Sequence, residues 1–559
     1  MIRIQTIKSF LGFGDGIRKG EYYYSQGIGR SREGIKPSWG ISKIIDSGTL
    51  GGLAVIKWFT QRKEADGKIY NFGVDKNGVI YKCEQLIGTW AAINSPVSSF
   101  GNGLGVDKKD NIIYAQHQYL GKGTTANPNV WTDNWKDLGA DEGTMPRPIE
   151  NYEDWTLIGN KNKIAGYTGD GTDFGPNLFN LPEGFVINNI KAGKTGVLIG
   201  ANKDNIGILV LWDCYSNRSI TPWIYLEGNI YSIASYNGQW IVAAGSKFFI
   251  TNGYTIETLC VPPDSRTSDT EFITTVTQVG MVVKDHYLFV NGKINGLNRK
   301  QTGLWIYDFR TKLWEFCPIS NNCVMYVNLG ALFVDNAFSF FTSYSSDYPA
   351  KRYIGMIYNG APQKSFYISS VLGATDTKKI AEGLILNLAF DLYNHSVYDS
   401  LNIKITAKIY DFKRQLWGVG VTSAVSTAKD ELKVDGAASG YNYAEIGDEI
   451  TILQGVNAGE IKHIKEIQNP GQTPEIWVLD SELPLLTEQS TYLGVCPFKK
   501  IGEQLITAPK IKDYYFNIKH SPIGKKFLIK ICLDMGRTYD MMIPELSSLS
   551  FIFNDLGIL

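Results

Sequence analysis

The feature that most constrains the fold is a repeated alternation of short apolar runs with tight-turn residues. In "IYSIASYNGQWIVAAGSKFFITNG", Ile230–Gly253, two turn signals separate three runs that are rich in β-branched and aromatic residues. Asn237-Gly238 tolerates a positive φ at both central positions of a type I′ turn, which is the turn that joins hairpin strands most readily. This stretch therefore predicts a meander of antiparallel strands.

Five other stretches repeat the order strand, polar turn, strand. They begin at Ile69, Asn102, Asp154, Lys194 and Gln278, at intervals of roughly 35 to 50 residues, which is the length of a propeller blade. A Trp recurs near the ends of the units, in "LIGTW", "DNWKDLG", "ITPWIYLEG" and "TKLWEFCPIS". We interpret this Trp as filling the gap that widens between blades away from the axis, although Trp also suits any half-buried strand. The repeats predict seven blades, without WD-repeat or kelch signatures.

The segments on either side of the repeats have a different character. Residues 1–45 are rich in Gly, Arg, Lys and Tyr without a period, which predicts an extended arm that is ordered against another protein or over its own propeller. Beyond residue 375 the runs alternate cleanly, as in a β-sandwich with one wet face. The inward residues are Leu386, Leu388, Phe390 and Leu392 in one run and Ile403, Ile405 and Ile409 in the next. Their partner strands are expected in "KDYYFNIKH", "KFLIKICLDM" and "LSFIFNDLG".

A compact pattern of its own interrupts this sandwich. The expected apolar set of the insertion is Ile450, Ile452, Ile461, Ile464, Ile467, Trp477 and Leu479. The ends, Gly418 and Cys496, should lie close together, because inserted units are tolerated where their ends meet. The chain is therefore predicted to be all-β, with an N-terminal arm (1–45), a β-propeller of about seven blades (46–375), a discontinuous β-sandwich (376–417 and 497–559) and a small inserted β-barrel (418–496).

Composition excludes some classes of function. Lys+Arg and Asp+Glu both number 55, so no global basic field favours nucleic-acid binding, although a local one is possible. The seven Cys residues are odd in number and form no CxxC, and most lie in apolar runs, which is typical of buried residues in a reducing setting. Cys317 and Cys323 are close enough in sequence to pair. We expect no signal peptide and no membrane-spanning segment.

Candidate chemistry is sparse. The five His residues, His117, His286, His395, His463 and His520, are far apart and lack metal-ligand spacing. The Gly-rich segments 12–16 and 27–29 lack the preceding strand and following helix of a phosphate loop. "VDKNGVIY", 74–81, is similar to an Asp-box hairpin but lacks its Ser and Trp, and "DGTDF", 170–174, is an incomplete calcium loop. The sequence thus predicts no catalytic, cofactor-binding or metal-binding residue and no enzyme.

The barrel segment "GDEITILQGVNAGEIKHIKEI" and the closing segments "KKIGEQLITAPKIKDYYFNIKHSP" and "PELSSLSFIFNDLG" resemble those of tailed-bacteriophage tail structural proteins. The likeness is to nozzle, or muzzle, proteins of short-tailed phages or to tail-tip and fibre-hub proteins. It implies a non-enzymatic virion protein, assembled in the host cytoplasm, that forms part of the tail conduit or tip. Its implied partners are its own copies in a ring, with six-fold symmetry favoured, an adaptor and fibres, and genome DNA only as passing cargo.

Two other classes of function stay open. One is a glycan-binding or glycan-cleaving propeller that recognises a receptor, which needs clustered Arg and acidic residues on the inner strands. The other is a cellular propeller that acts as an interaction scaffold, which the interrupted sandwich disfavours. Fold alone does not separate these classes.

Overall fold

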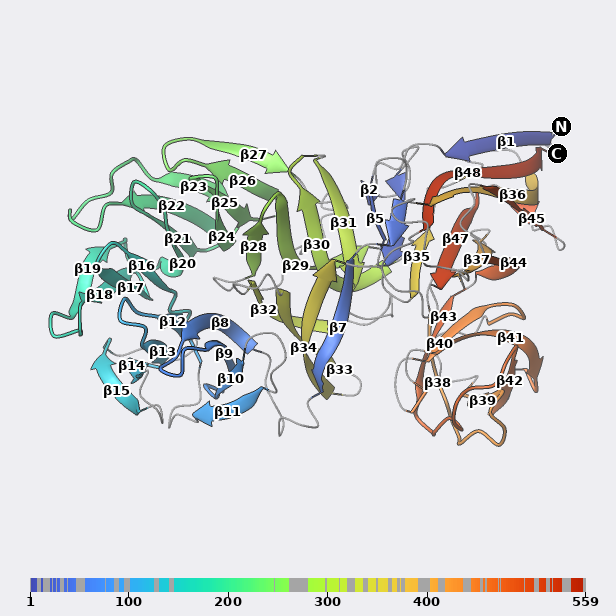
Figure 1. The fold of residues 1–559 in the computed structure, drawn as a ribbon, viewed down its shortest axis with the longest axis horizontal. Coiled ribbons are helices and arrows are strands. Elements are labelled where there is room, and N and C mark those ends of the chain that lie inside the picture. Colours follow the sequence, from blue (N-terminus) through green and yellow to red (C-terminus); the bar gives the residue numbers. More distant parts are fainter. Residues whose placement is uncertain are drawn as a thin grey trace.

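The computed structural model consists of strands, turns and loops, so the all-β prediction is confirmed. Figure 1 shows a ring of sheets on one side and a second group of sheets, with both chain ends, on the other. The described residues include no helix of the length and apolar character that crossing a membrane requires. The structure describes residues 2–7, 12–13, 21–22, 24–26, 28–30, 35–37, 39–46, 56–75, 77–84, 90–94, 101–124, 130–139, 145–245, 247–260, 280–296, 299–310, 312–318, 327–334, 340–347, 350–359, 364–368, 372, 378–390, 403–410, 418–435, 444–452, 456–457, 460–470, 472, 474–496, 498–506, 512–518, 523–524, 526–534 and 544–555.

Seven four-stranded antiparallel sheets make up the ring within the described part of the chain. Six of them follow the chain in order. They are β8 (Ile56–Lys63), β9 (Ile69–Asp75), β10 (Ile80–Glu84) and β11 (Ala91–Asn94); β12 (Gly103–Val106), β13 (Ile112–Gln116), β14 (Tyr119–Gly123) and β15 (Trp131–Asp137); β16 (Ile149–Tyr152), β17 (Trp155–Asn160), β18 (Lys163–Thr168) and β19 (Gly175–Asn180); β20 (Val186–Ala192), β21 (Val197–Lys203), β22 (Ile206–Trp212) and β23 (Ile224–Glu227); β24 (Ile230–Tyr236), β25 (Gln239–Ala244), β26 (Lys247–Thr251) and β27 (Ile256–Cys260); and β28 (Met281–Lys284), β29 (Tyr287–Gly296), β30 (Arg299–Asp308) and β31 (Leu313–Pro318).

The seventh sheet is completed from the other end of the chain. It contains β32 (Val327–Val334), β33 (Phe340–Asp347), β34 (Ala350–Asn359) and, paired with β34 at its edge, β7 (Trp39–Asp46). The first strand of each sheet contacts the first strand of the next, and β32 contacts β8, so the inner strands form a closed cycle. This is the arrangement of a β-propeller, which leaves few open sheet edges. The predicted start of the propeller at residue 46 is therefore too late, because β7 belongs to the ring.

Local predictions for the ring are confirmed at one turn and two Trp residues, whereas the ring contact of Trp90, at 5.7 Å between centroids, is with Phe59 of its own sheet. In the β24–β25 turn, Asn237 has φ 48° and Gly238 has φ 79°, as a type I′ turn requires. Trp135 on β15 makes an edge-on contact with Tyr167 of the next sheet, with ring centroids 5.1 Å apart. Trp314 on β31 contacts Phe248 of the preceding sheet at 5.4 Å. At both positions the Trp fills the space between neighbouring sheets, as the repeat pattern predicts.

The second group contains two larger sheets and one small pair. The seven-stranded sheet consists of β1 (Ile2–Ile7), β5 (Ile28–Arg30), β6 (Ile35–Pro37), β36 (Lys379–Phe390), β45 (Lys512–Asn517), β46 (Ile523–Gly524) and β48 (Pro544–Asp555). The five-stranded sheet consists of β4 (Tyr24–Gln26), β35 (Lys364–Ile368), β37 (Ile403–Tyr410), β44 (Lys499–Ile506) and β47 (Leu528–Asp534). A short parallel pair joins β2 (Gly12–Phe13) and β3 (Glu21–Tyr22).

These pairings correct the expected N-terminal arm. β1 runs antiparallel to β48, β4 pairs with β35, and β6 contacts β48, so this segment adds strands to both C-terminal sheets. Its described strands are neither laid only over the propeller nor held apart for another protein. Short polar strands with no period carry little pattern of their own, so their pairing is set by the partner strands. β35 also lies in a C-terminal sheet, although its residues were expected in the propeller.

The two C-terminal sheets share a hydrophobic core. Leu386, Leu388, Ile403, Ile405 and Ile409 are all buried in it, as predicted, whereas the side chain of Phe390 and all of Leu392 lie outside what the structure describes. The expected partner strands are confirmed, since β45 and β48 flank β36 and β47 pairs with β37.

Residues 418–496 form a sheet of their own, called the barrel below. Its six strands are β38 (Gly418–Val421), β39 (Glu431–Val434), β40 (Glu449–Ile452), β41 (Ile461–Gln468), β42 (Glu475–Leu479) and β43 (Tyr492–Cys496). A bridge between Thr422 and Val434 links the two end strands, which closes the sheet. Gly418 lies opposite Val495, so the prediction that the ends of the insertion meet is confirmed.

The expected apolar set largely forms the core of the barrel. Ile450, Ile452, Ile464, Trp477 and Leu479 are buried, and Ile467 is partly buried. Ile461 is a correction, because it is 38% exposed. Ile461 is the first residue of β41, at the edge of the barrel. The core does not extend to this position, so the side chain stays exposed.

Candidate interaction sites

The inner strands of the ring enclose a cavity of about 470 Å³. Its wall is partly polar and partly apolar, and the apolar residues include Trp58 and Phe59 from β8, Val106 from β12 and Val283 from β28. Each side chain comes from the first strand of a sheet, because those strands face the axis of the ring. A cavity of this size falls within the range that binds small ligands.

One ion pair stands in this wall. Lys191 Nζ on β20 lies 3.0 Å from Glu150 Oε2 on β16, and the pair links the third and fourth sheets. Glu150 is the single carboxylate among the described residues that line the cavity. Glycoside hydrolysis usually needs two carboxyl groups across the scissile bond. The described lining therefore offers polar recognition of a ligand rather than that acid–base pair.

The acidic turns that the sequence singled out have local partners. Asp75 Oδ1 of the Asp-box-like hairpin accepts hydrogen bonds from the backbone of Asn77 and Val79, at 2.8 and 3.0 Å. In "DGTDF", Asp170 accepts from the backbone of Thr172, and Asp173 accepts from the backbone of Thr168. These bonds are those of ordinary turns. No group of three or more His, Cys, Asp or Glu that could hold a metal ion occurs in the described part of the chain.

The His and Cys residues considered in the sequence analysis lie far apart in the structure. His117 lies in a turn with φ 43°, and the ring of His286 contacts that of Tyr287 at a tilt, whereas His395 and His520 lie outside the described residues. Burial raises the pKa of the Cys214 thiol to about 12, which keeps it protonated and unreactive at neutral pH. The proposed pairing of Cys317 with Cys323 cannot be followed, because Cys323 lies outside the described residues.

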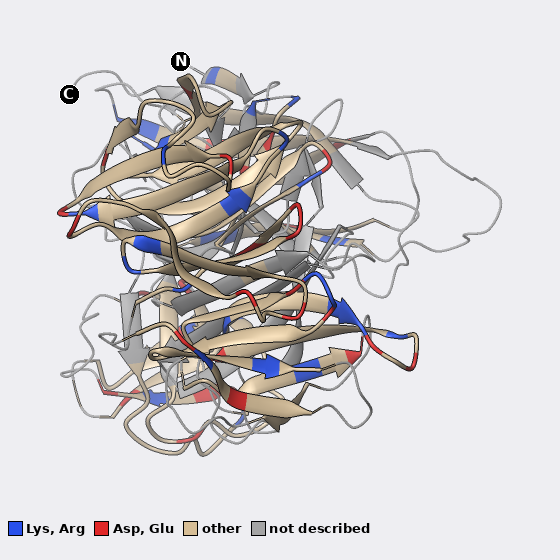
Figure 2. Cartoon of the chain, turned by 90° about the vertical axis from the view of Figure 1, so that its left-hand side faces the viewer, with Lys and Arg blue, Asp and Glu red and all other residues tan. Residues whose placement is uncertain are grey.

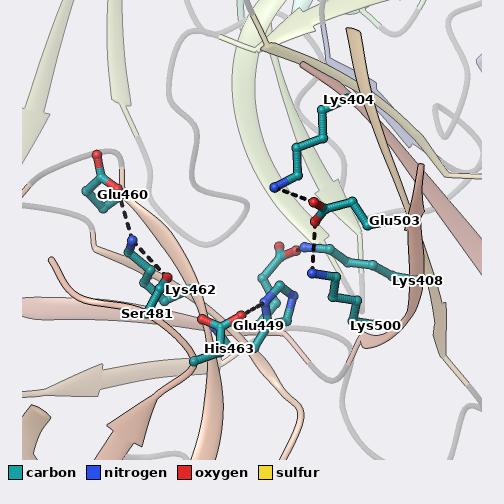
Figure 3. Close-up of polar contacts among 10 residues, drawn as sticks. Lys404, Lys408, Glu449, Glu460, Lys462, His463, Ser481, Lys500 and Glu503 are labelled. Atoms are coloured by element: carbon teal, nitrogen blue, oxygen red, sulfur yellow. Dashed lines mark hydrogen bonds and ion pairs between the residues drawn. The ribbon is translucent and has the colours of Figure 1, made fainter. Parts of the chain in front are cut away.

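A buried cluster of charges joins the barrel to the five-stranded sheet (Figure 3). Glu449, the first residue of β40, forms ion pairs with Lys408 on β37 and with Lys530 on β47, the second at 2.7 Å. All three side chains are at most 4% exposed. Burial alone would raise the pKa of Glu449, but the two ammonium groups hold it well below its usual value. Glu449 therefore stays ionised between two cations.

Sequence reasoning missed this junction. Lys408 falls on the face of β37 opposite to Ile405 and Ala407, which the alternation assigns to solvent, and the barrel then covers that face. Lys530 is flanked by buried Ile529 and Ile531 in the same way. A single Lys within a strand is ordinary in a sequence. Only the position of the barrel shows that these two are buried.

A second polar contact lies close to the junction. His463 Nδ1 on β41 is 3.2 Å from Asp480 Oδ2, and the backbone N–H of His463 donates to Asp480 Oδ1 at 3.0 Å. Burial lowers the pKa of His463, and this effect outweighs the opposite influence of Asp480. The imidazole is therefore neutral near pH 7.

Charge is divided unevenly between the parts of the chain. Residues 418–496 contain 12 Asp and Glu but only four Lys, a formal charge of −8. The propeller segment, 47–375, contains 28 of each sign, and Figure 2 shows both signs interspersed on that side of the molecule. Segments 1–46, 376–417 and 497–559, which hold β7 and all strands of the C-terminal sheets except β35, contain 23 Lys and Arg and 15 Asp and Glu, a formal charge of +8. The sequence itself carries this signal, which the net charge of zero conceals.

The barrel also exposes an apolar tip, defined by Val425, Val456, Leu485 and Leu486. Their exposed fractions are 54, 52, 52 and 45%. Hydrogen bonds bring their three turns together. Asn457 exchanges two bonds with the backbone of Leu485, and Ser426 exchanges two with Thr487.

The position of the tip follows from the course of the strands. β38 enters the barrel at Gly418 beside Val495, close to the C-terminal sheets, and ends at Val421 just before the first turn of the tip. The backbone N–H of Ser490 donates to the carbonyl of Thr422, so the chain returns to β43 from the same end. The tip is therefore the end of the barrel away from the buried charge cluster. Exposed aliphatic residues gathered at one place mark interaction surfaces more often than scattered ones do.

Comparisons with known proteins find a likeness of fold alone. No protein-family model and no curated protein matches the chain. Similar solved structures are β-propellers. They include the WD40 β-propeller domain of Doa1 (11% identity, 56% of this chain and 97% of that one, TM-score 0.38), streptogramin B lyase (15%, 58% and 98%, TM-score 0.40) and YCF48 bound to D1 peptide (10%, 56% and 94%, TM-score 0.39). At these TM-scores, the propeller assignment rests on the strand pairing of this chain.

Proposed function

We propose that this chain is a non-enzymatic structural protein of a bacteriophage tail, which forms part of the tail conduit or tip and docks other tail proteins. The more general part of the proposal is a scaffold that binds proteins. The finer part rests on the sequence resemblance and on the architecture described above. The observation that carries the proposal is that strands from the N-terminal segment pair with strands of both C-terminal sheets and of the propeller.

This strand pairing joins segments that are distant in sequence into one folded body. β1 and β6 contact β48, β4 pairs with β35, and β7 then closes the propeller against β34. The N-terminal segment therefore ties the C-terminal sheets to the ring, and separating them would break two sets of strand pairs. A body of this kind suits a part that must keep its shape within a symmetric assembly. The barrel, which closes on itself, is then available as a docking unit.

Electron microscopy of the purified full-length chain tests the assembly. Rings of repeated propeller-bearing subunits are expected, with six-fold symmetry as our first choice. Antibody labelling of purified particles tests the location and should mark the tail. A protein that is monomeric at every concentration and absent from particles would exclude this function.

A second candidate, recognition of a glycan, is favoured by the central cavity. Val106 and Val283, which are partly exposed, supply apolar surface, and the Glu150–Lys191 pair supplies polar groups for hydroxyls. A glycan array with the wild type and with Glu150→Gln decides between the two. Binding of a defined glycan that the variant loses would favour receptor recognition, whereas rings without glycan binding would favour the structural role.

A further inference from the structure

His463 lies at the contact between the barrel and the five-stranded sheet (Figure 3). It stands opposite Glu449 in the pairing of β40 with β41, so the two side chains project from the same face of the barrel. From that face, Glu449 directs its carboxylate to Lys408 and Lys530 of the sheet. The His463 side chain is 13% exposed. The imidazole is therefore enclosed in the same contact as the buried charge cluster.

The two nitrogens of this imidazole have different surroundings. Nδ1 lies 3.2 Å from Asp480 Oδ2, which favours the neutral tautomer in which Nδ1 carries the proton and donates to the carboxylate. Nε2 is buried and has no hydrogen-bond partner among the described residues. A proton on Nε2 would create a buried donor without an acceptor, which destabilises the docked arrangement. The contact therefore accommodates the neutral imidazole better than the imidazolium.

The charges around His463 act in the same direction. Lys408 and Lys530 contribute two positive charges to the contact, and Glu449 and Asp480 contribute two negative ones. A proton on His463 would add a third positive charge to a balanced set that is largely removed from water. The contact is therefore electrically balanced only while the imidazole is neutral.

The other charged groups of the surrounding elements are engaged in contacts of their own. Asp448 is buried, and its carboxylate accepts a hydrogen bond from the backbone N–H of Glu445, whereas Lys465, farther along β41, is exposed. The remaining groups form ion pairs with one another, Lys499 with Glu445, Lys404 and Lys500 with Glu503, and Lys462 with Glu460. None of these carboxylates accepts a hydrogen bond from Nε2.

We propose that this contact is acid-sensitive: protonation of His463 releases the barrel from the five-stranded sheet, and the released barrel stays folded. Release brings Nε2 into water and separates the imidazolium from the two lysines of the sheet. The barrel can remain folded because its sheet closes through the Thr422–Val434 bridge around its own core. Burial lowers the pKa of His463, which agrees with this direction. The contact lies within one chain, so release does not require the proposed tail function.

Proton linkage fixes the sign and the size of the effect. In the released barrel, His463 should titrate with an ordinary pKa of about 6.5, whereas in the docked barrel the imidazole resists protonation. Acid therefore favours release as the pH falls below about 6.5. Because one proton is involved, the ratio of released to docked barrel should rise by at most about tenfold between about pH 7.5 and 5.5.

Carbodiimide coupling of glycine ethyl ester to the full-length chain, read by mass spectrometry, measures release. Glu449 is 2% exposed and should react only from the released state, so its labelling rate follows the released fraction. Its rate is divided by that of Glu488, an exposed carboxylate of the same barrel, which cancels the pH dependence of the reagent. Oxidation of the buried core residue Trp477 by hydroxyl radicals, in parallel samples, reports unfolding of the barrel.

Matched variants separate His463 from other titrating groups. His463→Gln stays neutral at every pH and can still donate to Asp480, whereas His463→Lys carries a positive charge throughout. The control, His286→Gln, changes a propeller histidine whose Nε2 is likewise buried without a partner among the described residues.

We expect the normalised Glu449 rate to rise by up to about tenfold from about pH 7.5 to 5.5 in the wild type and in the control. In His463→Gln the rate should stay constant, and in His463→Lys it should be high at both pH values. Trp477 should stay protected from oxidation in every case.

Three results would overturn the proposal. One is a normalised Glu449 rate in the wild type that changes by less than about twofold over this pH range. Another is an acid response that persists in His463→Gln, since a different group would then control the contact. The third is oxidation of Trp477 that rises together with Glu449 labelling, because the barrel would then unfold rather than separate. If His463→Gln does not fold, His463→Lys decides, since a wild-type labelling rate in this variant at neutral pH would exclude the mechanism.

Discussion

The propeller is a closed ring of sheets and the barrel is a closed sheet, and the chain closes them by different means. The propeller needs β7, which lies before its first sheet in sequence and pairs with β34 in its last. The barrel closes within residues 418–496, through the bridge from Thr422 to Val434. The propeller is neutral, whereas the barrel carries −8 and touches the C-terminal sheets through buried charges. The comparison indicates that the ring and the C-terminal sheets form one folding unit and the barrel another.

Two deletions should give the largest effects in a test of these two folding units. Removing residues 1–46 takes away β7 and the N-terminal strands of both C-terminal sheets, so we expect an insoluble or non-cooperative product. Replacing residues 418–496 with a short Gly/Ser linker should leave a soluble chain that melts cooperatively, since Gly418 and Val495 are neighbours. Expression yield and calorimetry measure both. A well-folded protein without residues 1–46 would show that the pairing of the N-terminal strands is dispensable.

The excised chain also tests the role of the barrel. It should lose self-association or particle incorporation while keeping its fold. Normal incorporation would remove the barrel from the assembly contacts and leave it a peripheral part.

How far the sequence predicts these two regions differs for physical reasons. Hairpins such as β24–β25 and the inward residues of β36 follow from local turn chemistry and from alternation, so they are predicted correctly. The positions of β4 and β7 are not, because short strands take their place from partners more than 300 residues away. The interaction surfaces are partly visible in the sequence, since the charge of the barrel can be counted there. The buried junction is not visible, because Lys408 and Lys530 resemble outward residues until the barrel covers them.

The buried junction supplies the next largest expected effect. Glu449→Gln keeps the shape of the side chain but removes the negative charge that pairs with the buried Lys408 and Lys530, so we expect the free energy of unfolding to fall by about 3–5 kcal/mol where the barrel meets the sheet. The control is Glu445→Gln, whose ion pair with Lys499 Nζ at 3.1 Å is about half exposed and should cost at most about 1 kcal/mol. Denaturant unfolding measures the stability loss of each variant, and hydrogen exchange of β40 and β37 locates it. Equal effects would mean that water reaches Glu449.

Acid should lower the stability of the barrel before that of the propeller, without any mutation. The pKa of His463 is lowered by burial, so its contribution is present above pH 6.5 and is lost as the pH falls through the folded-state value. The pKa of Glu449 is also depressed, so its contribution is present above about pH 4.5 and is lost further down. After correction for the pH dependence of intrinsic amide exchange, the protection factors of the barrel should therefore fall in two stages below pH 6.5, before those of β21 and β25 do. His463→Gln should remove the first stage, and a uniform fall in protection across the chain would contradict the assignment.

The smallest expected effect comes from a matched pair of glycines. Gly238 in the propeller has φ 79° and Gly447 before β40 has φ 93°, and a Cβ atom would meet only side chains at ordinary distances, 3.5 and 3.7 Å. Alanine should therefore cost each site a similar conformational energy, about 1–2 kcal/mol. The melting temperature should respond differently, because about 1 kcal/mol shifts a unit of 60–100 residues by about 4–8 °C and a larger unit by about half of that. Calorimetry of Gly447→Ala should thus show a larger shift, in a separate barrel transition, than Gly238→Ala shows in the main transition. If both variants shift one common transition equally, the barrel unfolds with the rest of the chain, and the division into two folding units fails.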